Sequence, residues 1–263
     1  MRSPRLLAAA LLLAASCAYA DGQYAFVPGG LFHSAIAQEG NATDAVEVAP
    51  FRMRTKLVTN AEFLAFVKQD PGWSRDRVAP LFASSGYLSH WAGSSRLGDN
   101  APADQPVTKV SWFAARAFCA SEHARLPDWI EWEYAAAADA HHRDARADVI
   151  RKARILAALT ASFSSAQTKA DNSSAPNTYG LYGMHSLVGE WVNDYAALFV
   201  NADTRTPGGT GQLQLCGGAA LAFVDRTDYA LLMRVAALAA LAPADSANVG
   251  FRCVKDVGDG EKI

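Results

Sequence analysis

The sequence has little of several features that would mark other classes of protein. Its 263 residues carry 24 Lys and Arg against 26 Asp and Glu, a formal net charge of −2. Without an excess of basic side chains, a nucleic-acid partner is not expected. No stretch beyond the N-terminal leader is long and apolar enough for a transmembrane segment, and no Pro-, Gly- or Ser-rich linker divides the chain. We therefore expect one domain with ample length for a core.

The first twenty residues predict export. Arg2 and Arg5 precede an apolar run from Leu6 to Ala15, and the small-x-small triplet 18–20 follows. This pattern is typical of a secretory signal peptide, so residues 1–20 are predicted to be removed near Ala20 and residues 21–263 to form the mature domain. The expected location is the periplasm or the exterior. An alternative is a lipoprotein anchored through Cys17, but its processing box would begin with Ala where Leu is usual.

Three of the four cysteines follow the leader: Cys119, Cys216 and Cys253. In an oxidising compartment an odd number predicts one disulfide and one remaining thiol, or an intermolecular bond. The residues alone leave the pairing open.

Short elements and turns alternate along the chain. Strands are predicted within 23–32, broken by the turn at 28–30, and over 46–53. Helices are predicted over 61–68 with Thr59-Asn60 as cap, over 111–123 with Ser111 as cap, and from Pro127 onward with Asp128 as cap. The Ala-rich, charged stretch 135–161 predicts one or two solvated helices. The composition as a whole indicates an irregular α+β domain with small sheets and surface helices.

A long irregular stretch, 70–105, is rich in Gly, Ser, Asp and Pro and carries Trp73, Tyr87 and Trp91. Loops of this length are functional or disordered, and the spaced aromatics favour a binding surface.

Several sequence blocks, in order, resemble the formylglycine-generating-enzyme family, also called the sulfatase-modifying factors. The blocks are 58–63, 106–112, 117–119, 125–135, 179–185, 190–192, 217–218 and 248–253. The resemblance implies an elaborated C-type-lectin-like α+β fold across nearly the whole mature chain. It also implies a disulfide between Cys119 and Cys253, which would leave Cys216 as the odd thiol.

Most of these blocks are interpreted as scaffold. Trp112, Trp132 and Trp191 offer large apolar areas to a domain with little regular structure. Arg125, together with Glu131 or Glu133, is predicted to satisfy loop backbone groups that secondary structure leaves without partners.

The copper site of the family cannot be built in the usual way. In the resembling enzymes two cysteines follow the Gly-Gly segment and bind Cu(I) as thiolates, whereas residues 217–226 of this chain contain no cysteine. Cys216 precedes the glycines, and a buried, inert thiol is the expected role.

Calcium is the other metal that the resemblance implies, held by loop carbonyls and carboxylates. The block that matches one such site retains Glu190 but lacks the family's Asn and one Trp. The expected ligands here are Glu190 with carbonyl oxygens of its neighbours Ser186 and Val188.

A cleft is predicted around 225–234, where polar groups interleave with apolar ones. The candidate catalytic residues are Asp225, Asp228, Tyr229 and Arg234, with His185 as a group that exchanges protons near neutral pH. The same residues are also compatible with turn and helix-surface positions.

The resemblance is greatest to exported relatives without the copper cysteines, such as accessory proteins encoded with nitrite reductases and a pyoverdine-maturation protein. It implies a periplasmic maturation or accessory factor, with an oxidoreductase activity as one form. The expected partner is a peptide, siderophore or periplasmic protein client such as a metalloenzyme. The alternative is a non-catalytic, lectin-like binding or scaffold module. The oligomeric state and the client are left open.

Overall fold

The computed structural model describes residues 23–36, 45–164, 175–186, 188–198, 228–245 and 247–258. The predicted signal peptide, Cys216 and Asp225 lie outside these residues. No helix within the described ranges is long and apolar enough to cross a bilayer.

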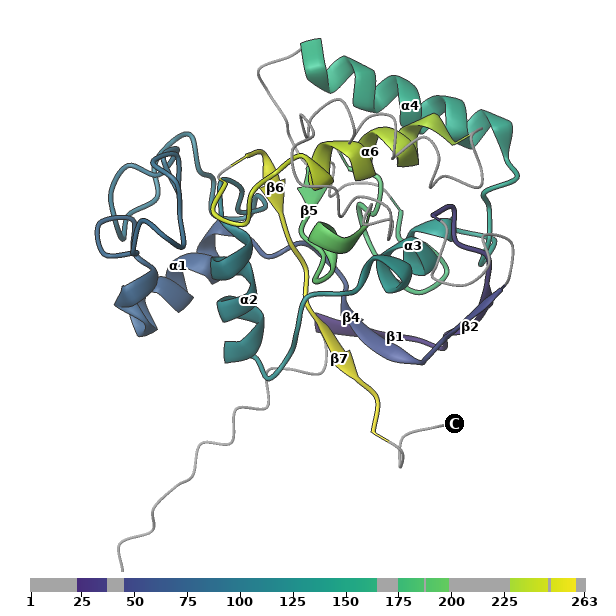
Figure 1. Ribbon diagram of the computed structural model, residues 1–263, viewed down its shortest axis with the longest axis horizontal. Helices are drawn as coiled ribbons and strands as arrows, with labels where there is room; N and C mark the ends of the chain where they lie inside the picture. Colours follow the sequence, from purple (N-terminus) through teal and green to yellow (C-terminus); the bar gives the residue numbers. More distant parts are fainter. Residues whose placement is uncertain are drawn as a thin grey trace, which may run out of the picture.

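In the described residues, three small sheets share one core (Figure 1). The largest is antiparallel, in the order β1 (Tyr24–Val27), β4 (Phe51–Arg54) and β7 (Val254–Asp256). A second antiparallel pair joins β2 (Gly30–Phe32) to β3 (Val46–Val48), and a parallel pair joins β5 (Gly189–Glu190) to β6 (Val249–Gly250). The predicted strand over 46–53 is therefore two strands, which break at Ala49-Pro50 and enter different sheets.

The turn between β1 and β2 depends on glycine. Gly29 has φ +68°, and a Cβ at this position would lie 2.1 Å from the carbonyl oxygen of Val48. Only a residue without a side chain can take this conformation so near the neighbouring backbone. The predicted turn at 28–30 is confirmed.

Two short helices and a 3-10 turn lie on one side of the large sheet: α1 (Asn60–Gln69), η2 (Pro71–Trp73) and α2 (Trp112–Ser121). The N-terminus of α1 has a capping box, in which Thr59 Oγ1 accepts from the Glu62 amide and Glu62 accepts from the Thr59 amide. Ser111 Oγ accepts from the Ala114 amide at the start of α2. The caps predicted from the sequence are confirmed.

The other helices lie on the opposite side, where α4 and α6 run side by side above α3 (Figure 1). They are α3 (Trp129–Ala137), α4 (Val149–Ser164), η3 (Tyr195–Ala197) and α6 (Tyr229–Ala239). Asp128 precedes α3 as predicted, and its amide donates to the Glu131 carboxylate at 2.8 Å.

The prediction of solvated helices over 135–161 is wrong for its first part. Ala135 to Ala138 are buried in the core, because their methyl groups allow close packing. Asp139 then accepts from the amides of His141 and His142, which closes a turn and ends the helix. The surface helix begins only at α4, where Val149 and Ile150 are exposed.

The irregular stretch 70–105 faces inward with its aromatic side chains. Tyr87 and Trp91 are 1% and 3% exposed, and Trp73 is partly buried against the core. Trp91 Nε1 donates to Asn60 Oδ1 at 3.0 Å, and Tyr87 donates to the carbonyl of Trp73. Trp91 thus anchors the loop to α1 and Tyr87 joins two parts of the loop, so the prediction that these rings form a binding surface is wrong for Tyr87 and Trp91.

A disulfide joins α2 to the C-terminal strand. Cys119 and Cys253 are bonded across 134 residues of sequence with their Cα atoms 5.5 Å apart, which confirms the pairing. Next to the bond, Phe63, Phe118 and Phe251 pack with ring centroids 5.3 to 6.0 Å apart.

Candidate functional site

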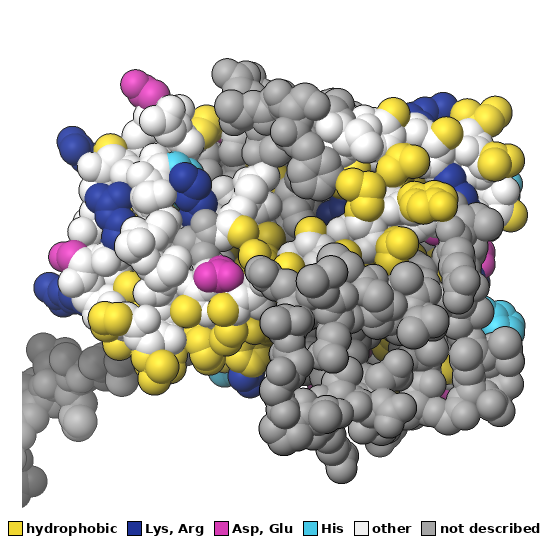
Figure 2. All heavy atoms as spheres, turned by 45° about the horizontal axis from the view of Figure 1, so that its top comes forward, with side chains coloured by type: hydrophobic (Ala, Val, Ile, Leu, Met, Phe, Trp, Pro, Cys, Tyr) yellow, Lys and Arg dark blue, Asp and Glu magenta, His cyan; other side chains and the backbone are white. Residues whose placement is uncertain are grey.

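The residues predicted to form a cleft do not gather at one point. Asp228 is the N-cap of α6, and its carboxylate accepts from the Leu231 amide at 3.0 Å. Tyr229 is 60% exposed, and its helix α6 packs against α4, on which Val149 and Ile150 are also exposed. Figure 2 shows apolar side chains gathered over α4 and α6 on this face. Arg234 is buried on the opposite side of α6 from this surface.

His185 is held neutral rather than poised to exchange protons near pH 7. Its Nε2 lies 2.7 Å from the Ala136 carbonyl oxygen and 3.0 Å from Arg151 Nη2. Burial, followed by the charges of Arg151 and Arg234, lowers its pKa to about 3. Because Arg151 Nη2 also donates to the carbonyls of Ala136 and Ala138, the consistent tautomer carries the proton on Nε2, which donates to Ala136. His185 therefore helps to close the C-terminus of α3.

A pocket of about 490 Å³ lies between the end of β2, the loop that enters α4, and the N-terminus of α6. Its described lining comprises His33, Ser34, Ala35, Asp144, Arg146, Ala147, Lys152, Asp228 and Leu231. Pockets of this volume hold small ligands or short peptide segments. Among the predicted residues, Asp228 lines this pocket.

One wall of the pocket is held by a buried carboxylate. Glu133 of α3 is 2% exposed and accepts from Ser34 Oγ at 2.6 Å, from the Ala35 amide at 2.7 Å and from Trp129 Nε1 at 2.9 Å. Burial raises its pKa, although these donors and the charge of Arg146 act in the opposite direction. Glu133 therefore fixes the turn at 34–36, whose Ser34 and Ala35 face the pocket.

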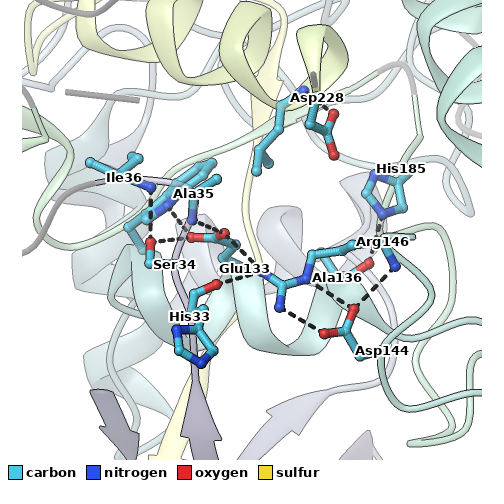
Figure 3. A network of polar contacts seen from close by, with 12 residues as sticks. His33, Ser34, Ala35, Ile36, Glu133, Ala136, Asp144, Arg146, His185 and Asp228 are labelled. Carbon is cyan, nitrogen blue, oxygen red and sulfur yellow. Dashed lines mark hydrogen bonds and ion pairs between the residues drawn. The ribbon is translucent and has the colours of Figure 1, made fainter. Parts of the chain in front are cut away.

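A second wall is an arginine fork. Arg146 Nε and Nη2 donate to the two carboxylate oxygens of Asp144 at 2.9 and 2.7 Å, and Nη1 donates to the His33 carbonyl. Its guanidinium carbon also lies 4.1 Å from the centroid of the Phe32 ring. The fork lowers the pKa of Asp144. Figure 3 shows Asp228 reaching from α6 toward this group, so the pocket presents charges of both signs to a ligand.

Residues 13–257 match the family model described as the sulfatase-modifying factor enzyme 1-like domain. The chain belongs to this family. It is 30% identical over 282 residues to the formylglycine-generating enzyme of Streptomyces coelicolor, covering 88% of each chain. It is 36% identical over 106 residues to the hercynine oxygenase of Mycobacterium tuberculosis, covering 36% of this chain and 25% of that one. A solved structure of PvdO from Pseudomonas aeruginosa has a TM-score of 0.47 and 16% identity, covering 88% of this chain and 93% of that chain.

The membership confirms the fold class expected from the blocks, an irregular α+β domain of the sulfatase-modifying-factor type. The segment 217–226, which the resemblance predicts to correspond to the family's copper-cysteine segment, lies outside the described residues. Within its sequence no cysteine is present to supply a thiolate.

The oxygen atoms predicted to hold calcium have protein partners. Glu190 pairs with Arg252, and Arg234 donates to the carbonyls of Ser186 and Val188. Glu190 is 4% exposed and Arg252 is fully buried. These oxygens are thus engaged by guanidinium groups, which is a poor fit to a metal that takes six to eight oxygen ligands.

Sequence reasoning did not identify Arg146 or Asp144 as pocket residues, nor Glu133 as the buried carboxylate that holds the turn at 34–36. Glu133 was considered a partner for Arg125, but Arg125 pairs with Glu131, through two bonds of 2.7 Å. A signal was present in the sequence Asp144-Ala145-Arg146, since an acidic and a basic residue two apart in a loop can form a local fork.

Proposed function

We propose that this protein is an exported maturation or accessory factor of the sulfatase-modifying-factor family, which binds its client in the pocket between the end of β2, the loop that enters α4 and the N-terminus of α6. The client is a peptide, a siderophore or a segment of a metalloenzyme. Export rests on the leader at 1–20, with cleavage near Ala20 and release into the periplasm or the exterior. A lipoprotein anchored at Cys17 remains the alternative.

The observation that carries the proposal is the pocket itself. Its Arg146–Asp144 fork, its Ser34 turn and the Asp228 carboxylate present donors and acceptors at fixed positions. A peptide backbone, or a small molecule with both ammonium and carboxylate groups, matches charges of both signs. The wall is fixed before binding, because Glu133 holds Ser34 and Ala35 from behind and Asp144 holds Arg146 at the wall itself, and such preorganisation favours affinity.

Copper chemistry through the family's cysteine pair is not part of the proposal, because residues 217–226 supply no thiolate. An oxidoreductase activity would need another redox centre, and the segment 199–227 is outside the described residues. The second candidate, a non-catalytic binding module, is favoured by one specific feature. Three titratable groups at the described wall have protein partners, since Arg146 pairs with Asp144 and the Asp228 carboxylate accepts from the Leu231 amide.

Metal content and oxygen uptake separate the two forms of the proposal. Purified mature protein is analysed for bound copper and iron and then incubated with a thiol reductant and peptides from a periplasmic extract, while dissolved oxygen is recorded. Stoichiometric copper or iron together with oxygen uptake supports an oxidoreductase. Retention of specific peptides without uptake supports the binding module.

The pocket is tested by a matched pair of variants. Arg146→Met removes the fork at the wall, whereas Arg154→Met removes an exposed arginine of α4 outside the pocket lining. We expect retention of periplasmic peptides to fall at least tenfold, about 1.4 kcal/mol of binding free energy, in Arg146→Met only. Equal retention by the wild type and both variants would contradict the proposal.

A further inference from the structure

The segment from Tyr182 to Glu190 is tied to the core through its oxygen atoms. Arg234 of α6 donates from Nη2 to the Ser186 carbonyl at 2.8 Å and from Nη1 to the Val188 carbonyl at 3.2 Å. A single planar guanidinium therefore bridges two carbonyls two residues apart. Arg234 is 8% exposed, and its guanidinium carbon lies 5.5 Å from the centroid of the Trp132 ring, which contributes a cation–π contact.

A second guanidinium holds the end of the same segment. Arg252 donates from Nε and Nη2 to the two oxygens of Glu190 at 2.6 and 3.0 Å. Its Nη2 also donates to the Tyr182 carbonyl at 3.1 Å, and its Nη1 donates to the Arg54 carbonyl at 3.4 Å. Arg252 thus connects both ends of the segment to β4.

Among the oxygen-bearing groups of this segment are the carbonyls of Tyr182, Ser186 and Val188 and the carboxylate of Glu190. Each accepts from a buried arginine. To bind calcium they would have to lose these hydrogen bonds and leave guanidinium groups buried without partners, which is costly.

The local charge is also unfavourable for a metal ion. Arg234 and Arg252 bring two positive charges against the single negative charge of Glu190. The pKa of Arg234 is lowered by burial and by the charge of Arg252, while Glu190 acts in the opposite direction. A divalent ion at this point would add two further positive charges to a cluster that is already net positive.

We propose that in this chain the guanidinium groups of Arg234 and Arg252 take the place that a calcium ion would have in the 182–190 segment, and that the folded state of the domain requires no calcium. A guanidinium suits this role because it is a permanent cation with several donors in a fixed plane. Two of them provide the positive charge and the multiple contacts to oxygen that would otherwise come from a metal.

Thermal unfolding of the mature protein tests the metal part of this proposal. The midpoint Tm is measured by circular dichroism in a calcium chelator and in millimolar calcium chloride. A cation that bound the folded state in excess of its Kd would raise Tm by mass action. We expect the same Tm, within error, in both solutions. A rise of several degrees with calcium would overturn the proposal.

Substitution of Arg234 tests the arginine part. Arg234→Met, which has a similar length and no donors, is expected to lower Tm by several degrees even without metal, since two buried carbonyls lose their partners. Arg234→Lys keeps the positive charge but cannot donate to both carbonyls in one plane. Its Tm is expected to lie between those of the wild type and Arg234→Met. The matched control Arg154→Met on the surface of α4 is expected to match the wild type.

Two results would contradict the role of the fork. One is an Arg234→Met protein with the Tm of the wild type, and the other is an Arg234→Lys protein that is no less stable than the wild type. If Arg234→Met does not fold, the Arg234→Lys protein alone decides, because it keeps the buried charge and alters only the number and direction of the donors.

Discussion

Around α1 and α2 the irregular backbone is held by rings and a disulfide, whereas around α3 and α6 it is held by arginines and carboxylates. In the first region, Trp91 anchors its loop to Asn60, and Phe63 and Phe118 pack beside the Cys119–Cys253 bond. In the second, Glu133, Arg234 and Arg252 each bind backbone or side-chain groups from elements far away in sequence.

The difference has a physical consequence. Apolar packing depends little on pH and tolerates modest changes of shape. Removal of one partner from a buried ion pair lowers the stability of the fold much more, because the other charge is left without a partner in a medium of low polarity. The pocket is built on the charged region, so its shape is more sensitive to single substitutions and to pH than the rest of the fold.

Arg252→Met is expected to have the largest effect on the charged region. It leaves Glu190 buried without its cation, and we expect unfolding free energy to fall by about 3 to 5 kcal/mol. Chemical denaturation at neutral pH measures this. The double variant Arg252→Met/Glu190→Gln is expected to lose less than the sum of the single variants.

The matched control for Arg252 is Arg125→Met. Arg125 also donates two hydrogen bonds to a carboxylate, that of Glu131, but the Arg125 side chain is 34% exposed. We expect a loss of about 1 kcal/mol or less, because solvent screens the pair. If Arg125→Met and Arg252→Met lost the same unfolding free energy, burial would not be the reason for the contribution of Arg252 to stability.

The disulfide makes the next largest expected contribution, on the apolar side. Replacing Cys119 and Cys253 together by Ala is expected to reduce unfolding free energy by about 2 to 4 kcal/mol, mainly by freeing the unfolded chain. Denaturant titration of wild type and double variant under non-reducing conditions measures the change. Peptide mapping without reduction should link the two cysteines, and alkylation of the unfolded protein should label Cys216; a crosslink from Cys216 to either would contradict the account.

Asp194 gives the smallest effect and a distinct pH dependence. Its carboxylate accepts from the Trp129 amide at the start of α3, and burial raises its pKa to about 6 from an ordinary value of 3.8. Between about pH 4 and 6 the folded state therefore binds more protons than the unfolded one, and stability falls as pH rises through this window.

In Asp194→Asn the side chain does not titrate, so this pH-dependent loss of stability is absent, while the side-chain amide oxygen still accepts from the Trp129 backbone amide. We expect the variant to gain about 1 kcal/mol relative to the wild type between pH 4 and pH 7, after allowance for partial exposure. Urea titrations of both proteins at several pH values measure the difference. A difference that is independent of pH would show that Asp194 has no raised pKa.

The sequence predicted local features well. Thr59, Ser111 and Asp128 could be recognised as caps because each lies directly before an apolar helical pattern, and the family blocks predicted both the fold and the disulfide. The end of α3 was not predicted, because the run of alanines continues past Ala137 without a change in pattern. The structure ends the helix with the Asp139 turn and with Arg151 from α4.

The pocket was predicted only in part, through Asp228. One of its walls depends on a pair that no local pattern reveals, because Ser34 and Glu133 are separated by 99 residues. Outside the pocket, the same holds for Glu190 and Arg252, which are 62 residues apart. Arg234 and Glu190 were chosen for their chemical type, but the type alone did not indicate that each would face a partner inside the core instead of a ligand.

Site-specific photo-crosslinking tests the central claim, that the client binds in the pocket, most directly. A photoreactive phenylalanine analogue replaces Ala147, an exposed alanine of the pocket lining, or Ala120, an exposed alanine of α2 far from it. Each protein is irradiated in a periplasmic extract, and adducts are identified by mass spectrometry. The account predicts a specific peptide, siderophore or protein adduct from position 147 that is absent from position 120. The same adducts from both positions, or an adduct from position 120 alone, would contradict it.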